Sequence, residues 1–174
     1  IDYITIASTG NAIDFGNLTV ARYSTGSCGS STRGLTGGGN PSSNVIDYVE
    51  ITTLGNSLDF GDLVSAQYGV ASASSPTRGF WLGGTADDGT MQYVTIASTG
   101  NAIDFGNLTV PRSRAHSASS STRAICGAGN GPSSTNSIDY VLIASTGNAL
   151  DFGDMNSANG SSGGAACSNG HGGL

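Results

Sequence analysis

Residues 1–18 read IDYITIASTGNAIDFGNL, and this stretch returns three times along the 174-residue chain. The later copies are IDYVEITTLGNSLDFGDL from Ile46, MQYVTIASTGNAIDFGNL from Met91 and IDYVLIASTGNALDFGDM from Ile138, at spacings of 45, 45 and 47 residues. A period of this length is typical of arrays in which each repeat is one supersecondary unit packed on its neighbours. We therefore expect residues 1–174 to form a single repeat domain.

A second phrase recurs between these copies, and together the two phrases predict two hairpins per repeat. It reads STRGLTGGG from Ser31, SPTRGFWLGG from Ser75, STRAICGAG from Ser121 and, in a worn form, SNGHGGL from Ser168. The first hairpin joins strands expected near residues 2–7 and 12–18 across STGN, where Gly and Asn tolerate a positive φ. The second joins strands expected near residues 21–30 and 33–38.

The composition favours strands throughout. The chain has no Lys and one Glu, so the residues that usually fill exposed helix positions are missing. Short runs of Val, Ile, Thr and Tyr alternate with Gly, Asn and Ser. An all-β fold is predicted, and four short antiparallel strands per repeat favour the blades of a β-propeller. A β-solenoid with two coils per repeat and other stacked-hairpin arrays are the alternatives.

The order of glycines and aromatics within the repeat resembles the kelch repeat. Kelch blades carry a double glycine after the second strand, a Tyr on the third and an aromatic on the fourth. The matching residues here are Gly38, Gly39, Tyr48 and Phe60, then Gly83, Gly84, Tyr93 and Phe105, and more weakly Gly127, Gly129, Tyr140 and Phe152. The resemblance implies about four four-stranded antiparallel blades. Two departures are that Phe replaces the usual Trp and that the Tyr-to-aromatic spacing is longer.

The wording of the repeat is also similar to that of phage structural and tail-fibre-like proteins. The phrases that carry this similarity are IASTGNAIDFGNLTVAR and STRG followed by glycines. They imply a virion or otherwise extracellular location. The absence of Met at Ile1 further indicates processing or a piece of something longer.

The phase of the repeat predicts how the ring closes. The chain begins with a first-type hairpin and ends with a second-type hairpin, so residues 156–174 are expected to pair with residues 1–18 and complete one blade. Closure would remove exposed strand edges. A fragment of a longer array, or two chains forming a larger ring, would show the same half-blades.

Charge and composition exclude several classes of partner and cofactor. The net charge of −6 opposes binding to nucleic acid and anionic lipid, and no apolar run approaches the roughly 20 residues that span a bilayer. The three cysteines form no CxxC pair, and His116 and His171 lie in no ligand-spaced cluster. We expect a soluble protein without metal or cofactor.

Two charged phrases repeat in register. DFG occurs at Asp14, Asp59, Asp104 and Asp151. The same triplet binds metal in protein kinases, but a kinase also needs a catalytic Lys and this chain has none. A bulge or turn is therefore expected at DFG. The TRG arginines, Arg33, Arg78 and Arg123, are predicted to form structural ion pairs with aspartates of the DFG or IDY phrases. The alternative is an arginine cluster that grips a sugar carboxylate, as in sialidase propellers, although their Asp-box motif is absent.

Variation among the copies indicates where a ligand would bind. The connections after the glycines differ in length and content, whereas STGN and STRG hardly change. The candidate ligand-binding residues are Asn40, Asn44, Asp87, Asp88, Asn130 and Trp81. Neutral drift of the loops, a solvated turn rather than a calcium site at Asp87 and Asp88, and a packing role for Trp81 are the alternatives.

The sequence therefore predicts a non-enzymatic structural or adhesion module. We expect a virion fibre or decoration component that presents one propeller face to host glycans or to other virion or surface proteins. Homo-oligomerisation is compatible with the repeat. A secreted cellular lectin or surface-filament subunit is the alternative, and a sialidase-like or other propeller enzyme ranks below both.

Overall fold

The computed structural model describes residues 1–85, 89–131, 134–158, 160 and 166–168, and in this part of the chain all regular structure is β. This part of the chain contains no helix that could cross a membrane. The strands form one two-stranded and three four-stranded antiparallel sheets. The prediction of an all-β antiparallel fold is confirmed.

The four-stranded sheets follow one another along the chain, after an N-terminal hairpin (residues 1–18) that holds β1 (Asp2–Tyr3) and β2 (Ile13–Asp14). The first sheet contains β3 (Gly26–Gly29), β4 (Arg33–Gly37), β5 (Ser43–Glu50) and β6 (Leu58–Gln67). The second contains β7 (Ala71–Ser74), β8 (Arg78–Leu82), β9 (Thr90–Thr95) and β10 (Ile103–Asn107). The third contains β11 (His116–Ser119), β12 (Arg123–Gly127), β13 (Ser137–Leu142) and β14 (Leu150–Asp154).

Each four-stranded sheet spans the boundary between two sequence repeats. Its first two strands come from the STRG hairpin of one repeat and its last two from the STGN hairpin of the next, as the phase of the repeat predicts. The predicted number of such sheets, four, is wrong, because the N-terminal hairpin forms a sheet of only two strands. Most of residues 156–174, its expected partners, lie outside the described residues.

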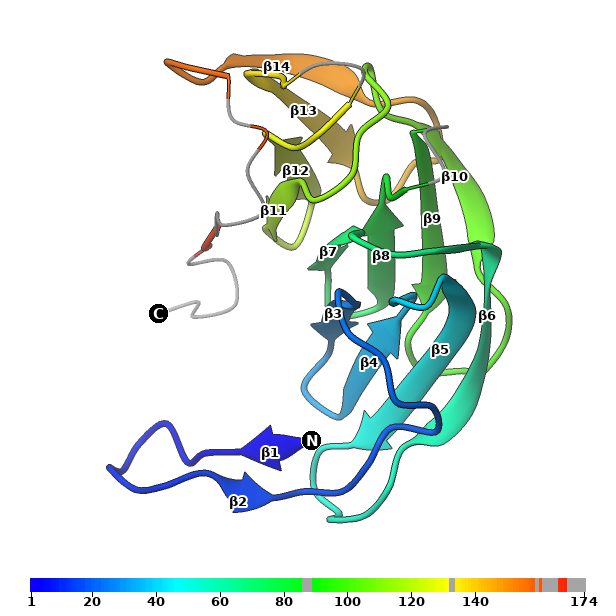
Figure 1. The fold of residues 1–174 in the computed structure, drawn as a ribbon, viewed down its shortest axis with the longest axis vertical. Helices are drawn as coiled ribbons and strands as arrows, with labels where there is room; N and C mark the ends of the chain where they lie inside the picture. The colour runs from blue at the N-terminus through cyan, green and yellow to red at the C-terminus, as the bar shows by residue number, and fades with distance from the viewer. Residues whose placement is uncertain (86–88, 132–133, 159, 161–165, 169–174) are drawn as a thin grey trace.

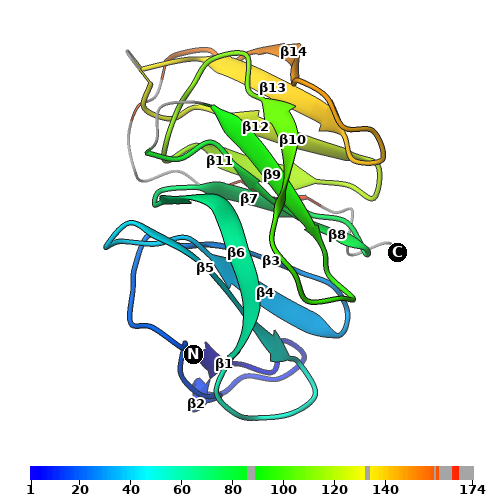
Figure 2. The same cartoon turned by 90° about the vertical axis from the view of Figure 1, so that its right-hand side faces the viewer.

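The sheets stack face to face along an arc that is open on one side (Figure 1). The first strands, β3, β7 and β11, lie on the concave side, and the last strands, β6, β10 and β14, lie on the convex side. Figure 2 shows the same succession from the hairpin to the third sheet, edge on. Apart from His116, the concave strands consist of Gly, Ala, Ser and Cys, small residues that let neighbouring strands approach closely.

Two apolar clusters hold the stack together, one in each gap between four-stranded sheets. Leu35, Ile46, Phe60, Trp81 and Ile96 lie in the cluster that joins the first and second sheets. The cluster that joins the second and third sheets includes Phe80, Leu82, Met91, Phe105 and Cys126. Burial of both sheet faces in these gaps is the main stabilising contribution to the stack.

The DFG phrase forms a β-bulge on the last strand of each four-stranded sheet. The ladder shifts register at this point in all three sheets, so the Phe has no partner across the ladder. In the second sheet, the side chain of Asp104 accepts a hydrogen bond from the backbone N–H of Gly106 at 2.9 Å. The prediction of a structural bulge is confirmed.

The DFG phrases of the N-terminal hairpin and of the first and second sheets each receive the turn of the following sheet, in an arrangement we call the turn clasp. The backbone N–H of Gly100, in the β9–β10 turn, donates to the carbonyl oxygen of Phe60 at 2.8 Å. The side chain of Asn101 accepts from the N–H of Asp62 at 3.0 Å. Gly61 has a φ of +145°, and a Cβ there would lie 2.5 Å from the carbonyl oxygen of Gly100. Equivalent clasps join Gly16 to Gly55 and Gly106 to Gly147.

Gly61→Ala should lower the free energy of unfolding by about 1–3 kcal/mol more than Gly153→Ala, because the added methyl group overpacks the clasp. Gly153 is the matched control, since its φ of +138° imposes similar backbone strain but nothing lies within 4 Å of its Cβ position. Urea unfolding of both variants followed by circular dichroism measures the difference. Equal losses would show that the backbone angle alone requires glycine.

Candidate binding face

The variable connections lie at one end of the sheets, beside the connections that follow the DFG bulges. Asn40 pairs through its backbone with Tyr23, with N···O distances of 2.7 and 3.3 Å. The backbone N–H of Thr85 donates to the carbonyl oxygen of Tyr68 at 3.1 Å. The third sheet repeats the pairing between Ser113 and Asn130. The variable loops therefore share one face with these connections, as predicted.

Backbone hydrogen bonds link these connections from one sheet to the next. The N–H of Gly69 donates to the carbonyl oxygen of Ser24 at 3.0 Å, and the N–H of Arg114 donates to that of Gly69 at 2.6 Å. Ser24, Gly69 and Arg114 all have a positive φ, between 54° and 65°. The variable face is thus one continuous rim across three sheets.

Two tyrosines and an arginine stand on this rim. Tyr23 is 65% exposed, Tyr68 is half-buried, and Arg114 is exposed and forms no salt bridge with a described residue. Flat aromatic rings with a polar edge provide apolar contact area together with a hydrogen-bonding group. A guanidinium binds a carboxylate or phosphate through paired hydrogen bonds. The rim therefore has the side chains needed to stack on a sugar ring and to bind an acidic substituent.

Tyr23, Tyr68 and Arg114 are not among the ligand-binding residues predicted from the sequence. The signal was present, because the two rim positions read Tyr-Ser, Tyr-Gly and Ser-Arg in successive repeats while the DFG phrase upstream stays constant. The loops after the glycines differ in length as well as in content, so their variation is more conspicuous than that of the rim positions.

The predicted ligand residues fall in three different places. Asn40, Asn44 and Asn130 lie at the variable face, where Asn44 is exposed and the other two are half-buried. Asp87 and Asp88 lie outside the described residues. Trp81 is 0% exposed, and its Nε1–H donates to the carbonyl oxygen of Gly26 at 3.0 Å. Sugar stacking by Trp81 is therefore corrected to packing between the first and second sheets.

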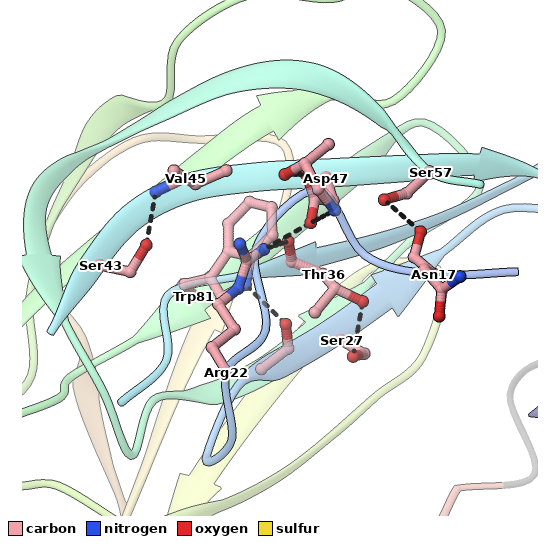
Figure 3. A network of polar contacts seen from close by, with 11 residues as sticks. Asn17, Arg22, Ser27, Thr36, Ser43, Val45, Asp47, Ser57 and Trp81 are labelled. Carbon is pink, nitrogen blue, oxygen red and sulfur yellow. Dashed lines mark hydrogen bonds and ion pairs between the residues drawn. The ribbon is translucent and has the colours of Figure 1, made fainter. Parts of the chain in front are cut away.

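The IDY aspartates form buried ion pairs, but with arginines outside the TRG phrase. Arg22 Nη2 lies 3.0 Å from Asp47 Oδ2, and Arg112 Nη2 lies 2.5 Å from Asp139 Oδ2, with all four side chains at most 1% exposed. Figure 3 shows Arg22 reaching both Asp47 and the carbonyl oxygen of Thr36, the latter at 3.1 Å. These pairs fix the joint between the rim and the third strand of the first and third sheets.

Two threonines add hydrogen bonds to the carboxylates of the buried pairs. Thr19 donates to Asp47 through its hydroxyl group at 2.5 Å and its backbone N–H at 3.2 Å. Thr109 donates to Asp139 in the same way, at 2.5 and 3.0 Å. The carboxylates are thereby hydrogen-bonded on several sides, as buried charges require, whereas Arg22 Nε and Nη1 and Arg112 Nε are buried without a partner among the described residues.

The TRG arginines use partners that the sequence did not predict. Their guanidinium groups stack on tyrosine rings of the same sheet, with distances to the ring centroid of 4.8, 4.6 and 5.0 Å for Arg33 on Tyr48, Arg78 on Tyr93 and Arg123 on Tyr140. Arg33 also forms a partly exposed salt bridge with Glu50 at 2.7 Å. Among the DFG aspartates, Asp14 and Asp104 accept hydrogen bonds from bulge glycines, whereas Asp59 lies opposite Asp47 in the ladder.

A groove of about 590 Å³ opens at the opposite end of the second and third sheets. It is lined by the SPTRG turn, the β11–β12 turn and the start of the β13–β14 turn. The charged side chain in this groove, Arg78, is already committed to Tyr93 and to the carbonyl oxygen of Ile143. Because the lining consists of invariant repeat phrases, the groove varies less between sheets than the rim does.

Metal and thiol chemistry find little support in the described residues. They contain no cluster of three or more His, Cys, Asp or Glu side chains that could hold a metal ion. Burial raises the pKa of the Cys28 thiol to about 12 and that of the Cys126 thiol to about 11, so both are unreactive near neutral pH. Cys167 is exposed, and no disulfide joins the three.

No protein-family model matches the chain, and no curated protein matches it either.

Proposed function

We propose that the chain is a non-enzymatic β-propeller module with kelch-like blades, and that its variable face binds a glycan or protein partner. The observation that carries the proposal is the continuous rim, on which Tyr23, Tyr68 and Arg114 reach solvent. Three face-to-face sheets with their first strands on the concave side support the propeller. Rigid sheets that carry a variable rim suit recognition, because the rim is positioned in advance of binding.

Among ligand classes, the rim favours an acidic glycan. The two tyrosines offer stacking surfaces on neighbouring sheets. Arg114 lies beside Gly69, because its backbone N–H donates to the carbonyl oxygen of Gly69 and its Cγ lies 3.2 Å from the Cβ position of Gly69. A chain of net charge −6 repels anions at long range, so an acidic ligand requires this local positive charge. A neutral protein surface is the second candidate ligand.

The location that we propose is the virion, as a fibre or decoration component, or otherwise the cell exterior. The support comes from the phage-like phrases of the repeat and from a surface of neutral polar side chains. Capsid and tail genes beside the gene for this chain would support the virion, and a secretion operon would instead support a cellular lectin or surface-filament subunit.

Tyr23→Ala and Tyr68→Ala should each weaken glycan binding about tenfold or more, as expected for aromatic anchors. Arg114→Ala should abolish the preference for acidic over neutral glycans. A glycan array identifies the ligand, and titration calorimetry then compares the variants with Ser121→Ala, an exposed position on the fixed turn at the opposite end. Equal affinity in all four variants would reject this face as the glycan site, and absence of any bound glycan would favour the protein partner.

A further inference from the structure

The third sheet carries the receiving half of a turn clasp that nothing in the described chain fills. Gly153 has the same φ, +138°, as Gly106, and its N–H donates to Asp151 at 3.0 Å just as Gly106 donates to Asp104. The bulge is therefore already in the clasp conformation. Nothing lies within 4 Å of the Gly153 Cβ position, whereas a carbonyl oxygen occupies this space at Gly106.

Apolar burial around this bulge is incomplete in the same way. Phe152 is 56% exposed, whereas its counterparts Phe15, Phe60 and Phe105 are 9%, 2% and 3% exposed. Its ring still packs edge-on against Tyr140 at 6.0 Å, as the other three pack against their tyrosines. The side chain is thus correctly placed, and only the following sheet is missing from its surroundings.

The N-terminal hairpin carries the complementary half. Within the described residues, Gly10 and Asn11 form no hydrogen bond, although Gly55, Gly100 and Gly147 each donate one across a clasp. Ile6 is 95% exposed, whereas Ile96 and Ile143 at the same repeat position, each covered by a preceding four-stranded sheet, are 1% and 4% exposed, and Ile51, preceded by the two-stranded hairpin alone, is 48% exposed. The face of the hairpin that would meet a preceding sheet is therefore apolar and uncovered.

A polar contact between sheets shows the same match. Arg33 Nη1 donates to the carbonyl oxygen of Ile96 in the next sheet at 3.1 Å, and Arg78 donates to that of Ile143 at 2.5 Å. Arg123 is stacked on its tyrosine in the same pose, yet it is exposed and bonds no carbonyl oxygen in the described residues. Because Ile6 has the same repeat position as Ile96 and Ile143, its carbonyl oxygen is the acceptor that the repeat predicts for Arg123.

The concave edge shows that this interface continues beyond the third sheet. The hydroxyl groups of Ser72 and Ser119 donate to carbonyl oxygens of the preceding sheet, each at 2.7 Å. Ser168 repeats this contact on Ser119 at 2.5 Å. The inner part of the interface is therefore occupied, and the outer part at Phe152, Gly153 and Arg123 is uncovered.

We propose that this outer part binds the N-terminal hairpin of a second copy of the chain, so that copies join head to tail through a fourth turn clasp. Residues 8–11 of one copy would dock on the Gly153 bulge of the other. The hairpin of the same chain is held on the first sheet, where Gly55 donates to Phe15 and Ser57 to Asn17, both at 2.9 Å, and its own turn at residues 8–11 is left uncovered. Figure 1 places it on the opposite limb of the arc from β14. Such a heterologous interface closes into a ring or extends as a filament.

Sedimentation velocity of the full chain over a range of concentrations tests the proposal. The wild type should assemble as concentration rises, and Ile6→Asp, Asn11→Ala and Gly153→Ala should each raise the dissociation constant at least tenfold. Ile103→Asp is the matched control, because this repeat position is exposed in every copy, at 55%, 58%, 58% and 57% for Ile13, Leu58, Ile103 and Leu150. Thermal unfolding of dilute samples verifies that the variants remain folded.

Cross-linking identifies the occupant. In a Cys167→Ser background, a chain with Asn11→Cys mixed with a chain with Asp154→Cys should form a cross-linked dimer through a short bismaleimide. The repeat places these positions in contact, since Asn148 accepts a hydrogen bond from Asn107 at 3.0 Å. Assembly that all three variants weaken, with dimer in the mixture, supports the proposal. A wild type that stays monomeric at every concentration, or a double variant that cross-links within one chain at high dilution, overturns it.

Discussion

Replacing Trp81 with alanine is expected to lower the free energy of unfolding by about 3–5 kcal/mol. The side chain is 0% exposed and fills the gap between the first and second sheets. Its loss leaves a cavity and removes the hydrogen bond from Nε1 to Gly26. Urea unfolding followed by far-UV circular dichroism measures the loss, since Trp81 is the only tryptophan and fluorescence disappears with it.

The cost should be this large because the facing sheet is shaped around the indole. A Cβ at Gly37 would lie 2.6 Å from the indole ring, and one at Gly26 would lie 2.9 Å from it. One repeat later, Leu82 occupies the position of Gly37, and Cys126 occupies that of Trp81. In the first gap a small residue, Gly37, meets a large one, Trp81. In the second gap the large residue, Leu82, is at the position of Gly37 and the small one, Cys126, is at the position of Trp81.

The exchange supplies a control for Trp81→Ala. Gly37→Leu alone should overpack the gap and Trp81→Cys alone should empty it, whereas the double variant imitates the next gap and should recover at least about 1 kcal/mol relative to the sum of the single losses. Additive losses would show that the indole is not matched to the glycines, and that the cost of its removal is lost apolar burial alone.

Much of the fold could be predicted because the deciding signals are local. The STGN and STRG turns fix hairpins, and their repetition fixes the phase in which two repeats share one sheet. The DFG bulge followed from a glycine next to an aromatic at a constant position. The common face of the variable loops followed from the alternation of turns along antiparallel strands.

Pairing across the whole chain could not be predicted in this way. The expectation that residues 1–18 would complete a four-stranded sheet depended on how far the arc bends per sheet, and no local pattern specifies that angle. Among the described residues, the N-terminal hairpin packs against the first sheet, through its clasp with Gly55.

The buried ion pairs were missed for a different reason, which the repeats themselves explain. Arg33 and its equivalents recur in three copies, which is why the sequence pointed to them as the ion-pair arginines. Arg22 has no arginine counterpart in the second repeat, where Gln67 replaces it. Three repeat positions that meet in space change together from one sheet to the next. The first and third sheets have Thr, Arg and Asp at these positions, and the second has Val, Gln and Gln. The three sets are Thr19, Arg22 and Asp47, then Val64, Gln67 and Gln92, then Thr109, Arg112 and Asp139.

Asp139→Ala is expected to lower the free energy of unfolding by about 3–5 kcal/mol, because it leaves the Arg112 charge buried without its partner. Arg112 would keep only carbonyl oxygens as acceptors, those of Ser137 at 3.2 Å and Cys126 at 3.3 Å. Glu50→Ala is the control from the same chain, since the Glu50–Arg33 pair is partly exposed and should contribute no more than about 1 kcal/mol. Equal losses for the two variants would contradict the role of burial.

The second sheet fills the same site with two neutral side chains, Gln67 and Gln92, although Gln67 Nε2 and Oε1 and Gln92 Nε2 are buried without a hydrogen-bond partner among the described residues. There the side chain of Gln92 accepts from the N–H of Val64 at 2.7 Å, in the place where Asp139 accepts from Thr109. Because two neutral amides avoid the desolvation of two ions, Arg112→Gln with Asp139→Gln should cost less than Asp139→Ala alone. Adding Thr109→Val completes the natural set and should recover more, since it removes a hydroxyl group that has lost its carboxylate acceptor. If the triple variant is less stable than Asp139→Ala, the second sheet tolerates glutamine for reasons outside these three positions.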